Sequence, residues 1–330
     1  MIILFIAVCI CISGTFWGAT WYLYERTFRR RYSSEITTEN VFYKKDASIL
    51  RKAIEIENEK NDKVEILSYD GIKLVGHYYK RKEKAPCIIF FHGYHGQASI
   101  DGIDIHKITE KMQWNLLLVT HRAHGESGGK YSSIGIKEQY DCLTWAQWAD
   151  KQFGKLASIY LMGLSLSAVV VLMSSTLKMP STVCGIIEDS GFTSYSAMAS
   201  YNARRMMPKF IPACFIVMML ALGAKVFGGF SIYKVDSCQA LKSDALPVLF
   251  IHGSADLWAP VAMAYELYDC CAGEKELLII EGANHGECYK TDPLKYETKV
   301  ITFIQRYKKN DGRKLYGKEY SDSECNRPCV

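Results

Sequence analysis

The stretch Ser158-Ile-Tyr-Leu-Met-Gly-Leu-Ser-Leu-Ser-Ala168 decides the fold of this 330-residue chain. Its first half is a continuous apolar run, which is typical of a strand buried on both faces of a sheet. An apolar helical pattern, Leu166–Lys178, follows at once. A sharp turn between the two would raise the hydroxyl of Ser165 above the strand end, with the small residues Gly163 and Ser167 on either side. Taken alone, such a serine is more often an ordinary helix N-cap.

Strand and helix patterns alternate along the rest of the chain. The expected strands are Lys63–Ser68, Lys73–Tyr79, Cys87–Phe91, Asn115–Thr120, Ser158–Met162, Thr182–Glu188, Pro247–Ile251 and Glu276–Ile280. Besides Leu166–Lys178, the expected helices are Gly135–Asp150, Val261–Cys270 and Asp292–Tyr307. We therefore predict an α/β fold with a mostly parallel eight-stranded sheet and helices on both faces. The dipeptide Asp70-Gly71 predicts a hairpin between the first two strands.

Three more polar loops follow expected strands, at residues 92–96, 252–256 and 282–286. A serine nucleophile needs a base that takes its proton and a carboxylate that orients the base. His285 and Asp256 supply these groups. The loop His92-Gly93-Tyr94 can aim the backbone N–H of Tyr94 at a developing oxyanion, together with the N–H of Leu166. His92, Gly93, Gly163 and Ser167 would support this arrangement.

Neighbouring polar residues have plainer explanations. Asp189 is an alternative acid, but we expect it to cap or orient the loop that follows it. A loop expected to shape the sheet edge contains Arg122, His124, Gly125 and Gly128, and two carboxylates on the next helix, Glu138 and Asp141, should be solvated or paired with it. For His95 and His121, a structural hydrogen bond is expected in preference to contact with substrate.

Six segments together resemble the α/β-hydrolase superfamily. They are FFHGYHG, THRAHGESGGKY, YLMGLSLSA, IIEDSGFTSY, LFIHGSADLWAP and EGANHGE, within residues 63–307. The chain is most similar to bacterial membrane-anchored serine hydrolases related to the prolyl-oligopeptidase-type and serine-aminopeptidase-type groups. The resemblance implies Ser165 as nucleophile, His285 as base, Asp256 as acid, and the Tyr94 and Leu166 backbones as oxyanion hole. It departs from the G-x-S-x-G pattern at Ser167.

The insertion of residues 192–245, between the sixth and seventh strands, lies where such hydrolases carry a helical lid. It contains an uncharged run, Ile211–Ala224, that is too short for an ordinary membrane span. Three explanations stay open: a lid that lines an acyl pocket, a segment that dips into the bilayer interface, or plain packing. Pocket lining would use Met206, Met207, Phe215, Met218 and Met219, because methionine adapts to irregular apolar ligands.

The first 24 residues carry no charged side chain and are long enough to span a bilayer. Interfacial aromatic residues end this run, and Arg26, Arg29, Arg30 and Arg31 follow it. The alternative is a cleaved signal peptide, but a basic leader and a small-residue cleavage site are missing. We expect a transmembrane anchor at 1–24, a juxtamembrane connector at 25–62 with a helix at Ala47–Glu57, the hydrolase domain at 63–307 and a charged tail at 308–330.

Composition narrows the class of protein. Hydrophobic residues make up 49% of the chain and charged residues 23%, which excludes a disordered chain. Four of the net +5 charges come from the arginine cluster, so a nucleic-acid partner is not expected. The twelve cysteines show neither a disulfide framework nor zinc-ligand spacing. Together with the arginines, they predict a single-pass protein of the cell membrane with a cytoplasmic main domain.

The sequence thus predicts a serine hydrolase that cleaves ester or thioester bonds through an acyl-enzyme, without metal or cofactor. The expected substrate is a small-molecule or lipid-like ester with an apolar acyl group. A peptidase or an acyltransferase could use the same triad, since fold and triad do not settle the substrate. A catalytically idle, membrane-tethered interaction module is the alternative from a different class.

Overall fold

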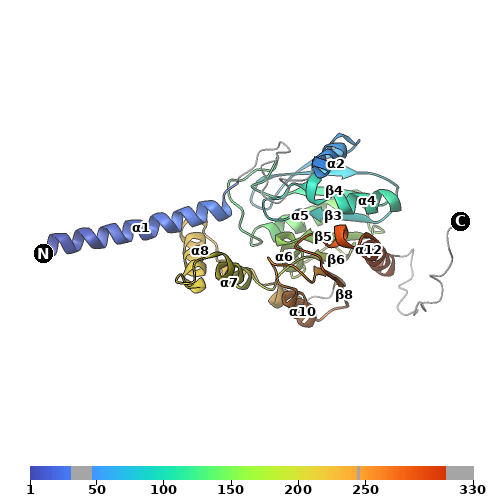
Figure 1. The fold of residues 1–330 in the computed structure, drawn as a ribbon. Coiled ribbons are helices and arrows are strands. Elements are labelled where there is room, and N and C mark those ends of the chain that lie inside the picture. The colour runs from blue at the N-terminus through green and yellow to red at the C-terminus, as the bar shows by residue number, and fades with distance from the viewer. Residues whose placement is uncertain (31–46, 244–245, 310–330) are drawn as a thin grey trace.

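The computed structural model describes residues 1–30, 47–243 and 246–309, so most of the expected tail and residues 31–46 of the expected connector lie outside the described residues. A long helix, α1 (Ile2–Phe28), projects from a domain built around one sheet (Figure 1). The strands are β1 (Asp62–Leu67), β2 (Lys73–Tyr79), β3 (Cys87–Phe91), β4 (Asn115–Thr120), β5 (Ile159–Leu164), β6 (Val183–Asp189), β7 (Val248–Gly253) and β8 (Lys275–Ile280).

The helices of the described ranges interleave with these strands as an α/β fold requires. They are α2 (Ala47–Asn58), α3 (Ala98–Asp101), α4 (Ile103–Met112), α5 (Glu138–Phe153), α6 (Leu166–Ser174), α7 (Tyr195–Met206), α8 (Ala213–Gly228), the 3-10 helix η1 (Ile232–Lys234), α9 (Ser237–Leu241), α10 (Val261–Cys270), α11 (Cys288–Thr291) and α12 (Pro293–Tyr307).

The sheet has the order β1-β2-β4-β3-β5-β6-β7-β8. β2 runs antiparallel to both of its neighbours, and all other pairs are parallel, which confirms the predicted mostly parallel eight-stranded sheet. β5 continues to Leu164, two residues past its predicted end. Ser165 therefore begins the turn directly at the strand end, near the centre of the sheet.

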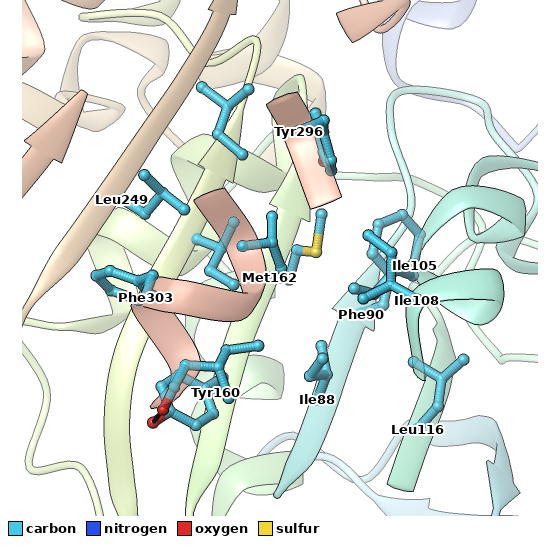
Figure 2. Packing of buried hydrophobic residues seen from close by; sticks show 14 of the residues in the cluster. Ile88, Phe90, Ile105, Ile108, Leu116, Tyr160, Met162, Leu249, Tyr296 and Phe303 are labelled. Carbon is cyan, nitrogen blue, oxygen red and sulfur yellow. Dashed lines mark hydrogen bonds between the residues drawn. The ribbon is translucent and has the colours of Figure 1, made fainter. Parts of the chain in front are cut away.

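Alternation along the central strands divides the core between the two faces of the sheet. Ile88 and Phe90 point toward α4 and α12, where Phe303 packs 6.3 Å from the ring of Tyr160 (Figure 2). Ile89, one residue along, points to the opposite face, which α5, α6 and α10 cover. Both faces are apolar because helices cover both, as in other doubly covered parallel sheets.

The C-terminal end of α1 belongs to the domain core. The helix continues to Phe28, four residues past the predicted anchor, and both Tyr24 and Phe28 are buried in a cluster with Leu166. After the helix, the backbone N–H of Arg30 donates to the carbonyl of Lys130 at 2.9 Å. The described side chains of α1 before Phe16 are exposed, and this part of the helix projects from the domain (Figure 1).

Within the insertion between β6 and β7, α8 packs against α1, and α9 packs against α6 and α10. α8 lies directly alongside α1, and α7 connects it to the domain (Figure 1). A Cβ atom added to Gly223 of α8 would lie 3.2 Å from Tyr24 and 3.3 Å from the carbonyl of Thr20. A glycine at this position lets the two helices approach closely, as small residues do between membrane helices.

A buried ion-pair network fixes the loop that follows β4. The guanidinium of Arg122 is 1% exposed and donates to both carboxylate oxygens of Asp141 at 2.6 Å and of Asp70 at 2.9 Å. Burial raises the pKa of Asp141 to about 6 despite this pairing. Glu138 is also buried, where Ser132 and Ser133 donate to it. Solvation, one of the two expected states, is therefore wrong for both carboxylates, since α5 turns them inward.

We predict that Arg122→Met lowers the free energy of unfolding by about 3–5 kcal/mol, because it strands the buried charge of Asp141. Urea unfolding followed by tryptophan fluorescence measures this change. Arg306→Met, which removes a half-exposed pair with Glu276, is the control and should cost less than about 1 kcal/mol. The double variant Arg122→Met with Asp141→Leu should recover part of the loss, and an equal loss in both would contradict the explanation.

Candidate active site

Ser165 sits on a strained turn between β5 and α6. Its backbone angles are φ 57° and ψ −114°, in a region that residues with a side chain rarely adopt. A Cβ atom at Gly163 would lie 2.1 Å from the carbonyl oxygen of Ser167, so only glycine fits there. Strain of this kind is found where a strand-to-helix turn presents a nucleophile. The side chain of Ser165 is partly exposed.

Ser165, His285 and Asp256 form one continuous chain of hydrogen bonds. The Oγ of Ser165 lies 2.7 Å from Nε2 of His285, and Nδ1 of His285 lies 2.7 Å from Oδ2 of Asp256. The loops after β5, β7 and β8 bring these side chains together, because parallel strands end at the same edge of the sheet. With Nδ1 donating to the carboxylate, Nε2 is left to accept the proton of Ser165.

The carboxylate of Asp256 is fully buried and well supplied with donors. Oδ1 accepts the backbone N–H groups of Trp258 and Ala259 at 2.8 and 2.9 Å. Burial raises the pKa of Asp256, but the hydrogen bonds from His252 and His285, the charge of His285 and the Ala259 N–H outweigh it. The net pKa lies below its ordinary value, so Asp256 is a stable anion that can orient His285.

His252 is a second histidine on this carboxylate, one that the sequence reasoning missed. Its Nε2 lies 3.3 Å from Oδ2 of Asp256 and 2.7 Å from the carbonyl of Ala259. The side chain is fully buried. Its position four residues before the acid, in the quoted segment LFIHGSADLWAP, is the signal that could have pointed to it.

Asp189 holds the loop of His285 and lies away from the hydrogen-bond chain itself. Its carboxylate accepts the hydroxyls of Ser190 and Tyr296, both at 2.8 Å. Ser190 in turn accepts the backbone N–H of Gly286 at 3.2 Å, next to His285. The contact with Ser190 agrees with the expected role of Asp189 in the loop that follows it, whereas the link to the loop of His285 was not expected. Glu188, also missed, is buried nearby, and burial raises its pKa to about 8.

The glycine turn after β3 lies against the turn of Ser165. A Cβ atom at Gly93 would lie 3.7 Å from the Cβ of Ser165, and the N–H of Gly93 donates to Asp101 at 2.8 Å. Leu166 is the first residue of α6, so its N–H is one of the four that a helix leaves without an intrahelical acceptor. The turn and the helix start thus flank Ser165 where an oxyanion would form.

Ser167 replaces the glycine of the usual pattern and has a contact that glycine could not make. Its hydroxyl donates to the carbonyl of His92 and accepts from Nε2 of His121 at 2.6 Å. The hydrogen bond expected for His121 is therefore present. His92 donates from Nδ1 to the carbonyl of Gly93 and accepts the N–H of His121. Burial lowers the pKa of His92 and of His121, so both rings stay neutral and keep these roles.

The oxyanion-side loop is also tied to α1. The hydroxyl of Tyr94 donates to the carbonyl of Thr27, in the last turn of α1, at 2.7 Å. The guanidinium of Arg30 donates to the carbonyl of Ser127 at 2.9 Å and to that of Gly125. Arg30 was expected to mark the membrane edge. Its contacts instead place it on the domain, and no sequence pattern predicted these two hydrogen bonds.

The five residues expected to line an acyl pocket differ widely in exposure. Met206, Phe215 and Met218 are 66%, 41% and 44% exposed, and Met219 is buried. The ring of Phe215 lies 6.4 Å from that of Phe16 in α1. Met206 ends α7, whereas Phe215 and Met218 belong to α8. The assignment of these side chains to an acyl pocket stays a prediction. Met207 is partly buried.

Within residues 1–30, 47–243 and 246–309, no cluster of three His, Cys, Asp or Glu side chains is arranged to hold a metal ion. The ten cysteines of these ranges are all free thiols. Burial raises the pKa of Cys87 and Cys288, so both are protonated, inert core residues.

Sequence comparison finds no family model that matches the chain. An uncharacterized Bacillus subtilis protein, YqkD, is 25% identical over 234 residues, which are 71% of this chain and 76% of that protein. Lysophosphatidylserine lipase ABHD12 of Danio rerio is 24% identical over 195 residues, 58% of this chain. The chain matches about half of that lipase, 49% of its length.

Solved structures show the same fold. An esterase of Pyrococcus furiosus, Pf2001, superposes with a TM-score of 0.61 at 22% identity, over 76% of this chain and 93% of that one. The α/β-hydrolase GrgF from Penicillium sp. superposes with a TM-score of 0.59 at 17% identity, over 76% and 99%. The chain therefore has the α/β-hydrolase fold, which confirms the predicted fold.

Proposed function

We propose that the chain is a serine hydrolase that cleaves ester bonds. The observation that carries this proposal is the hydrogen-bonded chain from Asp256 through His285 to Ser165, with Ser165 on a strained strand-to-helix turn. A structural serine would need neither the strain nor an aligned imidazole–carboxylate pair. Esterases and a lipase among the similar proteins support the same reaction class.

The reaction follows from the positions of these groups. His285 takes the proton of Ser165 as the oxygen attacks the ester carbonyl, and the backbone N–H groups of Tyr94 and Leu166 stabilise the oxyanion. His285 then protonates the leaving alcohol, which leaves an acyl-enzyme. Water activated by the same imidazole releases the acid and restores Ser165. Asp256 stays ionised throughout and stabilises the imidazolium.

The alternative function, a catalytically idle interaction module, is no longer supported by the serine at position 167. That alternative rested on Ser167 in place of glycine, and the contacts of Ser167 with His92 and His121 explain the serine without any loss of the turn. A peptidase or acyltransferase would use the same groups. We propose the esterase because the similar proteins with named activities act on esters.

We further propose that α1 is a retained membrane anchor with the domain on the cytoplasmic side. Among the described helices, α1 is the one long and apolar enough to cross a membrane by length and composition. A cleaved signal sequence would satisfy the same criterion, but cleavage would remove Tyr24 and Phe28 from the core of the domain. The arginines after the helix and the free thiols support the cytoplasmic placement.

We predict that Ser165→Ala abolishes labelling by a fluorophosphonate probe and lowers kcat/KM for p-nitrophenyl octanoate by at least about 10⁴-fold. The reason is that the probe and the ester both require the oxygen of Ser165. In-gel fluorescence and absorbance assays of the purified protein measure the two effects. Ser175→Ala, at the far end of α6, is the control, and equal labelling of Ser165→Ala would refute the assignment.

We predict that Tyr94→Phe lowers kcat roughly fivefold while KM stays unchanged, because one hydrogen bond that holds the oxyanion loop against α1 is lost. Tyr131→Phe is the matched control. It removes a hydroxyl that also bonds to α1, at Glu25, but lies outside the oxyanion loop. Steady-state kinetics in detergent or nanodiscs compare the two variants. Equal effects of both substitutions would show that the Tyr94 hydroxyl stabilises α1 only.

We predict a preference for medium-length acyl chains, with kcat/KM for octanoyl at least about tenfold above that for acetyl p-nitrophenyl esters. The physical reason is the apolar cluster that surrounds Leu166, next to Ser165, and that includes residues of α1, α7 and α8. Rates on an acyl series from two to twelve carbons, below the micelle concentration of each ester, test it. A preference for acetyl would exclude an apolar acyl site.

A further inference from the structure

One face of α8, called here its outer face, is apolar and partly exposed. Phe215, Met218 and Val226 are 41%, 44% and 52% exposed, and with the partly buried Leu222 they repeat every three or four residues, which places them on one side of the helix. No charged residue occurs from Phe210 to Ala224, and the exposed Lys225 lies in the last turn of α8. A surface helix of a protein in water normally carries polar residues on this side.

The inner face of α8 is the side that packs against the protein, so the apolar outer face is not needed for packing within the domain. The inner residues Val217, Leu220 and Ala224 are buried against α1 and the cluster that contains Leu166. α8 is therefore hydrophobic on both sides, although only one side is covered by protein. Helices with this pattern are buried inside large proteins or lie in lipid.

We proposed above that α1 spans a bilayer. Its contacts with α8 then indicate how deep in the bilayer α8 lies. Phe215, near the start of α8, lies beside Phe16, and Phe227, near its end, lies 4.9 Å from the ring of Trp21. The start of α8 is thus farther from the domain than its end. Phe16 lies seven residues, or ~10 Å of helix, before Leu23, where α1 begins to join the domain core.

The turn that precedes α8 continues this apolar surface. Phe210 is 83% exposed and Met206 is 66% exposed, although both are large apolar side chains. Exposed basic residues, Arg204 and Lys209, flank them. Large apolar side chains interleaved with basic ones are typical of segments that lie at the surface of an anionic bilayer.

We propose that α8 and residues 206–212 are inserted into the same bilayer leaflet that α1 leaves, as a second, non-spanning membrane element. The outer face of α8 lies among acyl chains and the basic residues lie at the lipid phosphates. The partner is the lipid bilayer itself. Because the inner face of α8 packs in the same cluster as Leu166, this placement sets Ser165 close to the membrane surface. This inference rests on the proposed membrane anchor and does not require hydrolase activity.

Tryptophan quenching in nanodiscs of brominated and unbrominated lipid tests the proposal with the full-length protein. The added emission of Met218→Trp and of Phe210→Trp, after subtraction of the wild-type signal, should fall at least about twofold in brominated lipid. Leu294→Trp is the matched control, because Leu294 is 75% exposed on α12, on the other side of the domain from α8 (Figure 1). Its added emission should not change.

Wild-type protein separates the two proposals, because Trp17 and Trp21 belong to α1. If the wild-type emission is quenched while both α8 variants behave like Leu294→Trp, α1 is in the bilayer and the inference about α8 is overturned. The same result would follow if another protein chain covered α8. If the wild-type emission is not quenched, the anchor fails, and the placement of α8 fails with it. Fluorophosphonate labelling of Ser165 is a separate readout in every case.

Discussion

The close contact between β5 and α6 at Gly163 is the constraint on which the rest of the site depends. A side chain at Gly163 would overlap the carbonyl of Ser167. The first turn of α6 can therefore pack this closely on β5 only because Gly163 has no side chain. This packing forces the left-handed backbone of Ser165 and points its oxygen away from the sheet. The strain is held in place because Ser167, two residues along, is itself bonded to the loops after β3 and β4 through His92 and His121.

The orientation of His285 likewise depends on several neighbouring residues, each with a separate role. Asp256 keeps its charge although it is buried, since four donors converge on its two oxygens. Asp189 and Ser190 then fix the backbone beside His285 without competing for its ring. The imidazole is thereby restricted to one orientation, with Nδ1 committed to the carboxylate. A base that is preorganised in this way loses little free energy to reorientation when the reaction starts.

The sequence predicted the sheet and the order of Ser165, Asp256 and His285 because strand periodicity and loop motifs are local patterns. Contacts between distant segments were not predicted. Nothing local in Tyr94 indicates that its hydroxyl bonds to Thr27, 67 residues earlier, and the arginine cluster is explained equally by lipid phosphates and by the carbonyls that Arg30 binds. The residues of α8 were assigned to a pocket because methionine and phenylalanine suit apolar ligands of any kind. Whether such a side chain meets a substrate, a helix or a bilayer depends on which element packs against it.

If α1 is the proposed membrane anchor, its docking makes the anchor part of the domain core. Two large side chains of α1, Tyr24 and Phe28, are as buried as the central strands, and the same last turn of the helix binds the hydroxyl of Tyr94. A flexible tether would leave the orientation of the domain to chance, whereas a helix rooted in the core fixes the angle between the bilayer and Ser165. An apolar ester could then pass from lipid to the active site without crossing water. Since transfer of each methylene from lipid into water costs about 0.8 kcal/mol, a fixed geometry of this kind removes a cost that grows with the length of the acyl chain.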